Sequence, residues 1–171
     1  EPGFDEFDQS LHSIGYLFEH GFNEKTKLRH SLRRFEAEGK FNYVEIWQLA
    51  GDLRTTLNRY GIKRDVESEA TVADTSLEHQ WSSGPIQHTT LVGFDVTRQK
   101  DVNAQYLLSA VPLDLFNPSY GGSVDSPAPS TFYSPQSQTT FTGLYLQDQL
   151  KIADKWVLLL GGRYDRVKYN E

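Results

Sequence analysis

The stretch that decides the fold runs from Thr142 to Asp165 and reads TGLYLQDQLKIADKWVLLLGGRYD. On both sides of a short polar break at residues 153–155, apolar side chains return at every second position. Successive side chains of a β-strand point to opposite faces, so this period predicts two strands joined by a tight hairpin, with one apolar and one mixed face. The apolar face comprises Leu144, Leu146, Leu150, Ile152, Trp156, Leu158 and Leu160.

The same alternation occurs in four earlier segments, which turn-forming residues separate. These segments lie at about residues 10–22, 26–35, 69–81 and 88–99. We therefore predict three hairpins, or six strands of about 10–14 residues each, with short turns at 23–25, 82–86 and 153–155. The connections between the hairpins are longer, at about residues 36–66 and 101–137.

Strand length and loop length together favour a membrane barrel. Globular strands usually have about 5–6 residues, whereas about 9–11 tilted residues cross a bilayer. Short turns at one end and long connections at the other are typical of outer-membrane barrels, and Phe22, Trp81 and Trp156 near the short turns fit an aromatic girdle. The sequence therefore predicts an all-β fold, an antiparallel transmembrane β-barrel segment whose mixed face lines a water-filled lumen.

The composition excludes several other classes. Of the 171 residues, 37% are hydrophobic, which is too many for a disordered tail, and the net charge of −6 provides no basic stripe for nucleic acid. The chain has no cysteine, so disulfides, thiolate metal sites and cysteine nucleophiles are excluded. Its apolar runs are far too short for a membrane helix. Because methionine is also absent, we expect a piece of a larger chain.

Charged residues follow the predicted faces with a few exceptions. The predicted inner wall carries Arg29, Arg33, Glu78, Asp95, Arg163 and Asp165, which can pair with one another. Three residues do not fit, because His30, Arg34 and Asp148 fall on the apolar parity, and a carboxylate that faces lipid is costly. The histidines are scattered, and although His79 and His88 flank one turn, we expect no metal site.

The segments Thr142–Leu150 and Trp156–Asp165 resemble the barrel of TonB-dependent ferric-siderophore receptors, and most of all the ferrichrome-receptor branch. Residues 15–23, 88–95 and 111–118 resemble the same branch more weakly. The resemblance implies a protein of the bacterial outer membrane, with a 22-stranded barrel, a plug domain in its lumen and uptake powered by TonB. Residues 1–171 would then be a partial barrel domain of about six strands, with the plug absent.

The resemblance also implies where an iron(III)–siderophore complex would bind. In the ferrichrome-receptor branch, aromatic side chains at the start of the loop after the fourth strand, and on the following strand, approach the ligand. Tyr145 matches the branch's motif on the lumen-facing parity. Gln105 and Tyr106 open the expected loop, and Phe116 and Tyr120 lie further along it. These five residues are the predicted ligand-binding residues.

The sequence contains no pattern typical of a catalytic site, neither a Gly-rich phosphate loop nor a serine in a nucleophile elbow. We therefore expect no enzyme, no catalytic residue and no cofactor. The expected partners are the ferric siderophore, the TonB system through the plug domain and outer-membrane lipid. Two alternatives stay open: a soluble carbohydrate-binding β-sandwich, and a passive porin with similar strands but no plug.

Overall fold

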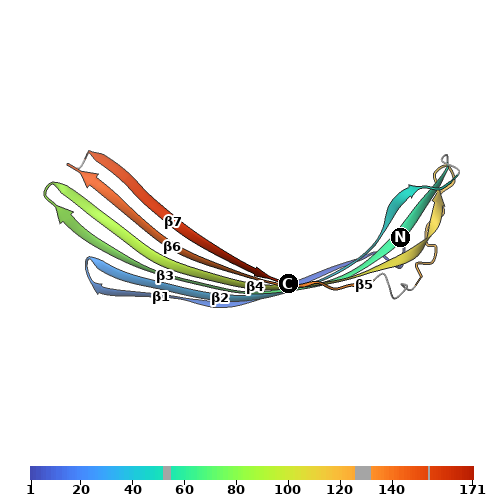
Figure 1. Cartoon of the computed structure of the whole chain (residues 1–171), viewed down its shortest axis with the longest axis horizontal. Coiled ribbons are helices and arrows are strands. Elements are labelled where there is room, and N and C mark those ends of the chain that lie inside the picture. The colour runs from blue at the N-terminus through green and yellow to red at the C-terminus, as the bar shows by residue number, and fades with distance from the viewer. Residues whose placement is uncertain (52–54, 126–131, 154) are drawn as a thin grey trace. The chain divides into compact units, whose positions relative to one another are not determined.

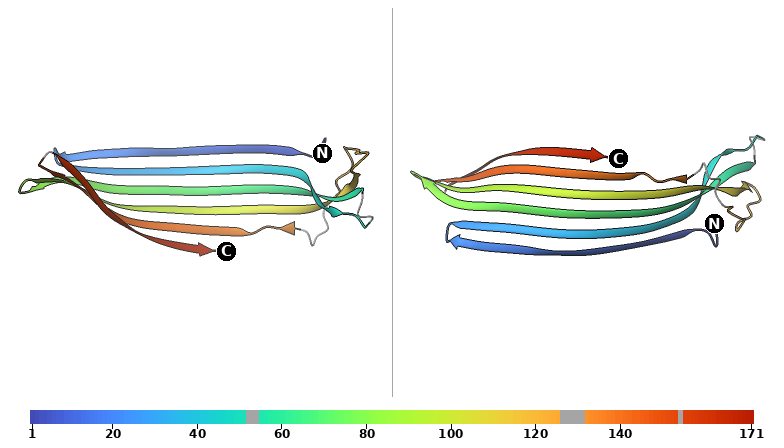
Figure 2. Two further views of the ribbon diagram at one scale, coloured as in Figure 1. Left: turned by 90° about the horizontal axis from the view of Figure 1, so that it is seen from above. Right: turned by 60° about the horizontal axis from the view of Figure 1, so that its bottom comes forward.

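The computed structural model describes residues 1–51, 55–125, 132–153 and 155–171, and long strands dominate them (Figure 1). The strands are β1 (Glu6–Asn23), β2 (Thr26–Leu49), β3 (Thr56–Ser83), β4 (Ile86–Asp114), β5 (Phe132–Tyr133), β6 (Gln136–Ile152) and β7 (Trp156–Asn170). They lie side by side in the order β1-β2-β3-β4-β6-β7, with β5 beside β4 (Figure 2). The predicted antiparallel all-β fold is confirmed. The described residues include no helix with the length and apolar character needed to cross a bilayer.

The predicted hairpin turns are confirmed in position. Two residues separate β1 from β2, and the Lys25 amide donates to Asn23 Oδ1 at 2.9 Å. Gly84 adopts a φ of 59° between β3 and β4, a left-handed conformation that glycine takes without strain. The third turn lies between β6 and β7, and its central residue, Asp154, is outside the described residues.

The strands are longer than the sequence pattern predicts. β2, β3 and β4 contain 24, 28 and 29 residues. The prediction of a long connection at residues 36–66 was wrong, because β2 continues to Leu49 and β3 begins at Thr56. The second expected connection, at residues 101–137, begins only after Asp114. In these extensions both faces carry polar or aromatic side chains, so the hydrophobic period fades while the backbone ladder continues.

The chain divides into two compact units, which we describe separately. Unit 1 comprises residues 1–12, 36–68 and 101–136, and unit 2 comprises residues 13–35, 69–100 and 137–171. The segments predicted from alternating hydrophobicity coincide with the strands of unit 2, which also contains the three hairpin turns. Unit 1 holds the strand extensions and the two longer connections.

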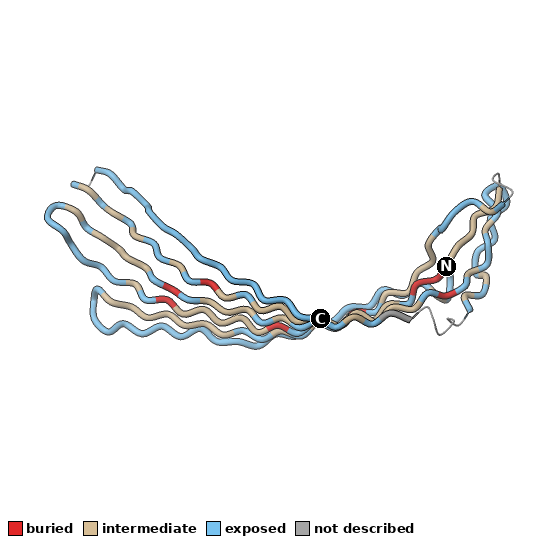
Figure 3. Tube along the Cα trace, viewed as in Figure 1, coloured by how far each residue is buried: buried red, intermediate tan, exposed pale blue. Residues whose placement is uncertain are grey.

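In unit 2 the apolar parity forms an open face. Leu144, Leu158 and Val92 are 55%, 47% and 41% exposed, although they belong to the most hydrophobic positions of their strands. Figure 3 shows how few of the described residues are buried, and the buried hydrophobic residues among them are Ile62, Ala70 and Leu108. A β-sandwich would bury such a face between two sheets, but the described strands form a single sheet, so the sandwich alternative was wrong.

The carboxylate on this apolar face is partnered. The register of β6 against β7 has no break, so no bulge turns Asp148 to the other face. Its two oxygens accept hydrogen bonds from His88 Nδ1 at 2.7 Å and from Thr90 Oγ1 at 2.9 Å. The His88 ring in turn stacks on Trp81, with ring centroids 4.0 Å apart. A polar cluster that satisfies its own hydrogen bonds thus replaces an isolated charge.

We expect His88→Leu to lower the thermal midpoint of the full-length protein more than His88→Leu combined with Asp148→Leu. The single change leaves a carboxylate on the apolar face without its main donor, whereas the double change removes both partners together. Thermal unfolding of the detergent-solubilised full-length protein measures the difference. A double variant as unstable as the single one would contradict the pairing.

Candidate ligand-binding site

On the mixed face of unit 2, Tyr145 of β6 reaches over Gly93 of β4 to Asp74 of β3. The Tyr145 hydroxyl donates to Asp74 Oδ2 at 2.9 Å. A Cβ at position 93 would overlap the Cζ and hydroxyl of Tyr145, closer than real Cβ atoms approach a neighbour. Gly93 therefore keeps open the path along which Tyr145 crosses its strand.

A second long side chain crosses a neighbouring strand in the same way. Arg163 of β7 passes over Gly143 of β6, where a Cβ would overlap its guanidinium. It pairs with Asp95 of β4, with Nη1 and Oδ2 2.7 Å apart, and its Nε donates to Asp165 Oδ1 at 2.8 Å. Further ion pairs on this face join Arg29 to Glu19 and to Glu78. The predicted pairing of inner-wall charges is thus confirmed for these residues.

These contacts fix the position of Tyr145, the predicted ligand residue that matches the motif of the ferrichrome-receptor branch. Its ring is half-buried, it lies in the middle of β6, and the Arg163 guanidinium lies 5.7 Å from the ring centroid. Both the hydroxyl and the ring therefore have partners on the same sheet before any ligand is bound. Tyr145 belongs to unit 2, whereas the other four predicted residues belong to unit 1.

Unit 1 contains an open groove of about 900 Å³ between β2, β3 and β4. Trp47 and Tyr60 meet edge to face on its wall, with ring centroids 5.9 Å apart and planes at 85°. Volumes of about 300–1,000 Å³, with aromatic walls and a few polar groups, are typical of small-molecule sites. We call this the aromatic groove; its lining comprises Ile46, Trp47, Gln48, Asn58, Arg59, Tyr60, Ile62, Gln105, Leu107, Leu108, Ser109, Ala110 and Pro112.

Of the predicted ligand residues, Gln105 lines the aromatic groove. Its Oε1 accepts hydrogen bonds from Nε and Nη2 of Arg64, at 3.1 and 2.8 Å. The expectation that Gln105 and Tyr106 open a loop was wrong, because both lie within β4, where Tyr106 is opposite Phe132 of β5.

Phe116 and Tyr120 do lie in the connection after β4, as predicted. Their side chains are 81% and 63% exposed, and neither lines the aromatic groove. The structure therefore brings one of the predicted residues, Gln105, into this groove and leaves these two aromatic residues at the surface.

The Tyr60 ring is held by a short hydrogen bond to a neighbouring strand. Its hydroxyl donates to Glu45 Oε2 at 2.5 Å. This hydrogen bond, together with burial and the negative charge of Glu45, raises the pKa of Tyr60 above its ordinary value. The phenol therefore stays protonated and remains a donor at neutral pH.

A buried ion pair lies beside the groove and ties down the connection after β4. Arg59 Nη1 donates to Glu1 Oε2 at 3.1 Å, and the two side chains are 6% and 3% exposed. The other Glu1 oxygen accepts from the backbone amides of Gly121 and Gly122 at 2.7 and 3.0 Å. Burial acts to raise the pKa of the Glu1 carboxyl, but the hydrogen bonds from Arg59 and these amides outweigh it and hold the pKa below its ordinary value.

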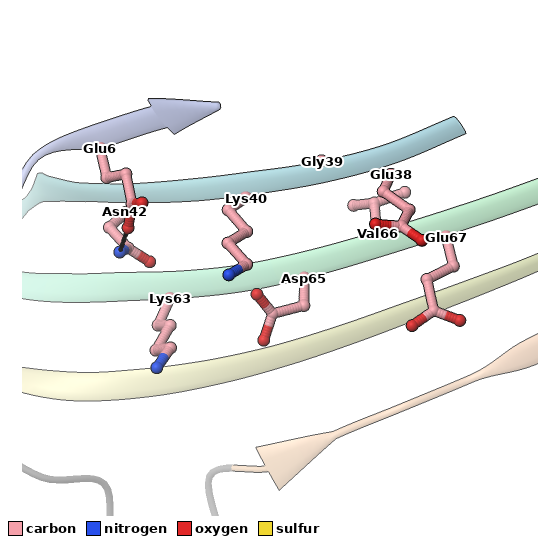
Figure 4. Close-up of a pocket in the computed structure, with 9 residues that line it drawn as sticks. All are labelled: Glu6, Glu38, Gly39, Lys40, Asn42, Lys63, Asp65, Val66 and Glu67. Atoms are coloured by element: carbon pink, nitrogen blue, oxygen red, sulfur yellow. Dashed lines mark hydrogen bonds between the residues drawn. The ribbon is translucent and has the colours of Figure 1, made fainter. Parts of the chain in front are cut away.

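A second, smaller groove of about 320 Å³ in unit 1 is lined mainly by charged residues, which are Glu6, Glu38, Lys40, Lys63, Asp65 and Glu67 (Figure 4). β3 contributes Lys63, Asp65 and Glu67 to this groove, whereas Tyr60 and Ile62, of the opposite parity, line the aromatic groove. Because strand side chains alternate, the side chains of Lys63, Asp65 and Glu67 lie on the opposite face of β3 from those of Tyr60 and Ile62.

Sequence reasoning missed Trp47 and Tyr60 because both fall in the segment that was expected to be a loop. A usable signal was present, since Phe41, Tyr43 and Trp47 share one parity of the chain. An alternation of aromatic residues rather than of leucines therefore marks this part of β2. Among the described residues, no group of three or more histidine, aspartate or glutamate side chains could hold a metal ion.

The family model for the TonB dependent receptor-like β-barrel matches residues 1–170. This match covers nearly the whole chain, and the two-faced antiparallel strands described above agree with it. The chain belongs to the TonB-dependent receptor β-barrel family.

Two curated relatives show how much of such a receptor the chain represents. It is 34% identical to the ferrioxamine B receptor of Salmonella typhimurium (strain LT2) over 169 residues, which are 98% of this chain and 23% of that receptor. It is 31% identical to the ferrichrome outer membrane transporter/phage receptor of Escherichia coli K12 over 174 residues, which cover 89% of this chain and 23% of that protein. The chain thus spans about a quarter of the length of these relatives.

Solved structures with the same fold agree. The ferric preacinetobactin receptor BauA of Acinetobacter baumannii superposes with a TM-score of 0.78 at 18% identity, over 96% of this chain and 25% of that one. The ferric citrate transporter FecA in its unliganded form superposes with a TM-score of 0.69 at 16% identity, over 97% of this chain and 22% of that one. At these identities the likeness supports the fold alone.

Proposed function

We propose that the chain is part of the barrel wall of an outer-membrane receptor that binds an iron(III)–siderophore complex. The observation that carries the proposal is the family match over residues 1–170, combined with relatives whose names are those of ferrioxamine and ferrichrome receptors. The apolar face of unit 2 would contact lipid, and its mixed face would line the lumen. Energy would reach the parent receptor through TonB and a plug domain, and this segment would perform no covalent chemistry.

The proposed ligand contacts are polar and aromatic side chains of β4 and β6 and of the connection after β4. A bulky ferric complex presents an organic shell, which aromatic faces and a few directed hydrogen bonds can hold. Tyr145 on the mixed face and Gln105 in the aromatic groove are the first candidates. For Tyr106, Phe116 and Tyr120, a role in ligand binding is still a prediction from the sequence.

We expect Tyr145→Ala to weaken binding of a ferric siderophore to the full-length receptor about tenfold, because it removes a preorganised ring from the mixed face. Titration with ferrioxamine B and ferrichrome measures the affinity. Tyr164→Ala is the matched control, since Tyr164 lies opposite Leu144 on the apolar face and is 70% exposed.

The affinities of the Tyr145→Ala variant and of the wild type test two different statements, the role of Tyr145 and the receptor proposal. Unchanged affinity in Tyr145→Ala would remove Tyr145 from the site and leave the receptor proposal standing. A wild-type receptor that binds no ferric complex, in a panel that also includes ferric citrate and a ferric catecholate, would contradict the receptor proposal itself.

A further inference from the structure

We propose that Asp148, on the apolar face of unit 2, binds the ammonium group of an amine-headed phospholipid, with the Trp81 indole beside the bound headgroup. The inference rests on the part of the proposed function in which this face contacts lipid. Asp148 lies between Leu146 and Leu150 on the apolar parity of β6 and opposite Leu160 of β7. A carboxylate in apolar surroundings is costly unless hydrogen-bond donors and opposite charge surround it.

The hydrogen bonds within the cluster leave part of the Asp148 carboxylate available. Among the described residues, one oxygen accepts from His88 and the other from Thr90. An ionised carboxylate has about four acceptor sites, so about two stay open. The Asp148 side chain is 26% exposed, whereas His88, which stacks on Trp81, is 10% exposed. The open side of the carboxylate therefore faces whatever covers the apolar face.

The charges on this face favour a cation as the occupant. Among the described residues, the lysine and arginine side chains on the apolar parity of the unit 2 strands lie toward the ends away from the hairpin turns; they are Arg34, Arg98, Arg166 and Lys168. Arg166 is opposite Thr142, six residues or about 20 Å along β6 from Asp148. With a neutral His88 the cluster carries a net negative charge. A single carboxylate does not supply the several oxygen ligands of a divalent cation, so an ammonium group with N–H donors is the better complement.

The cluster lies at the depth where lipid headgroups begin. Trp81 is two residues from the end of β3 and His88 is two residues from the start of β4, which places both about 7 Å from the turn. The polar layer on each side of the hydrocarbon core is about 5–7 Å thick. The cluster of Asp148 is therefore within reach of a headgroup.

Trp81 and Asp148 are close enough for one headgroup to contact both. The Trp81 indole N–H donates to Thr90 Oγ1 at 2.9 Å, and the same hydroxyl donates to Asp148 Oδ1 at 2.9 Å. The Trp81 side chain is 43% exposed, and aromatic rings attract ammonium groups. The carboxylate thus supplies charge and hydrogen-bond acceptors, and the indole supplies an aromatic surface for the same group.

The first experiment measures lipid retention by the full-length protein in native mass spectrometry. Protein in detergent is mixed with equal amounts of phosphatidylethanolamine and phosphatidylglycerol that carry the same acyl chains. The wild type should retain phosphatidylethanolamine in preference, and Asp148→Asn should lower this preference roughly tenfold. Glu69→Gln is the matched control, because Glu69 is an acidic residue on the same face of unit 2 that pairs with Arg34. It should leave the preference unchanged.

The second experiment uses the wild type alone, so it does not depend on the folding of a variant. Successive N-methylation of phosphatidylethanolamine keeps the positive charge and removes one N–H donor at a time, until phosphatidylcholine has none. Retention should fall along this series, because the carboxylate binds the ammonium through its N–H donors. Equal retention of phosphatidylcholine and phosphatidylethanolamine would overturn the proposed contact.

Titration of the same preparations with ferrioxamine B and ferrichrome distinguishes this inference from the function on which it rests. Asp148→Asn should leave the affinity for the ferric complex unchanged. A wild type that binds a ferric complex but retains both lipids equally, or neither, would overturn the lipid site and leave the receptor function standing. A wild type that prefers phosphatidylethanolamine but binds no ferric complex would support the lipid site and contradict the receptor function. Pairs of protein molecules that form in the wild type and are lost in Asp148→Asn would show that a second copy covers this face, which would also overturn the lipid site.

Discussion

Gly93→Val in the full-length receptor is expected to push Tyr145 away from Asp74 and to lower the free energy of unfolding by about 1–3 kcal/mol, the usual cost of overpacking. A Cβ at position 93 overlaps the Tyr145 ring, and the valine methyl groups occupy still more of its path. Denaturant unfolding of the receptor measures the loss. Because Tyr145 is also a proposed ligand contact, the affinity for the ferric complex should fall in parallel.

Two controls test whether the loss of stability comes from the crossing of the Tyr145 side chain over Gly93. Gly162→Val places the same side chain on β7 at a glycine whose Cβ would meet nothing within 4 Å, and it should be nearly neutral. Gly93→Val in a Tyr145→Ala background should cost less than in the wild type, because the ring that it displaces is gone. Equal losses in both backgrounds would contradict the crossing of Tyr145 over Gly93.

Arg59→Ala is expected to release the connection after β4 and to increase its cleavage by added protease on the order of tenfold. Among the described residues, the change leaves the buried Glu1 carboxylate with the amides of Gly121 and Gly122 as partners. An unpaired buried charge is strongly unfavourable, so this region should open more often. Cleavage within residues 115–125, followed by mass spectrometry, reports the opening.

The control for Arg59→Ala is Arg34→Ala. Arg34 and Glu69 form an ion pair at 3.3 Å, but their side chains are 51% and 54% exposed, and exposed pairs contribute little. This variant should leave the cleavage rate near that of the wild type. Similar rates for Arg59→Ala and the wild type would mean that the Glu1 pair does not hold the connection.

The stabilisation by the Glu1–Arg59 ion pair depends on pH. The pKa of Glu1 is lower in the folded protein than its ordinary value. The stability that the ionised Glu1 carboxylate contributes is therefore fully present above the unfolded pKa of about 4.3, and it is lost as the pH falls through the folded pKa. The connection should therefore stay protected at neutral pH.

The sequence predicts the strands of unit 2 well because one face of each carries apolar side chains at every second position. Leu144, Leu158 and Val92 set a period of two that determines faces, hairpins and order. The period of two does not predict the extensions of β2, β3 and β4 in unit 1. There, side chains such as Lys40, Lys63 and Trp47 put polar or aromatic groups on both faces of the strands. A ladder of backbone hydrogen bonds carries no hydrophobic signal.

Partners across the sheet are the other part that the sequence alone cannot supply. Asp148 looks misplaced on the apolar parity until His88, 60 residues earlier, is found beside it. In the same way, the aromatic groove joins Trp47 and Tyr60 of adjacent strands to Gln105 of a third. Tyr145 kept its predicted parity, but its bond to Asp74 depends on the glycine at position 93.

The central claim is that alternate side chains of the strands in unit 2 meet lipid and water. Residues 1–171 contain no cysteine, so single cysteines at successive positions from 142 to 150 can carry a nitroxide label in a bilayer-reconstituted receptor in which cysteines elsewhere have been replaced. Collision with dissolved oxygen should peak at Leu144, Leu146 and Leu150, and collision with a water-soluble nickel complex should peak at Tyr145, Gln147 and Gln149. Equal accessibility of both parities to the nickel complex would contradict the claim.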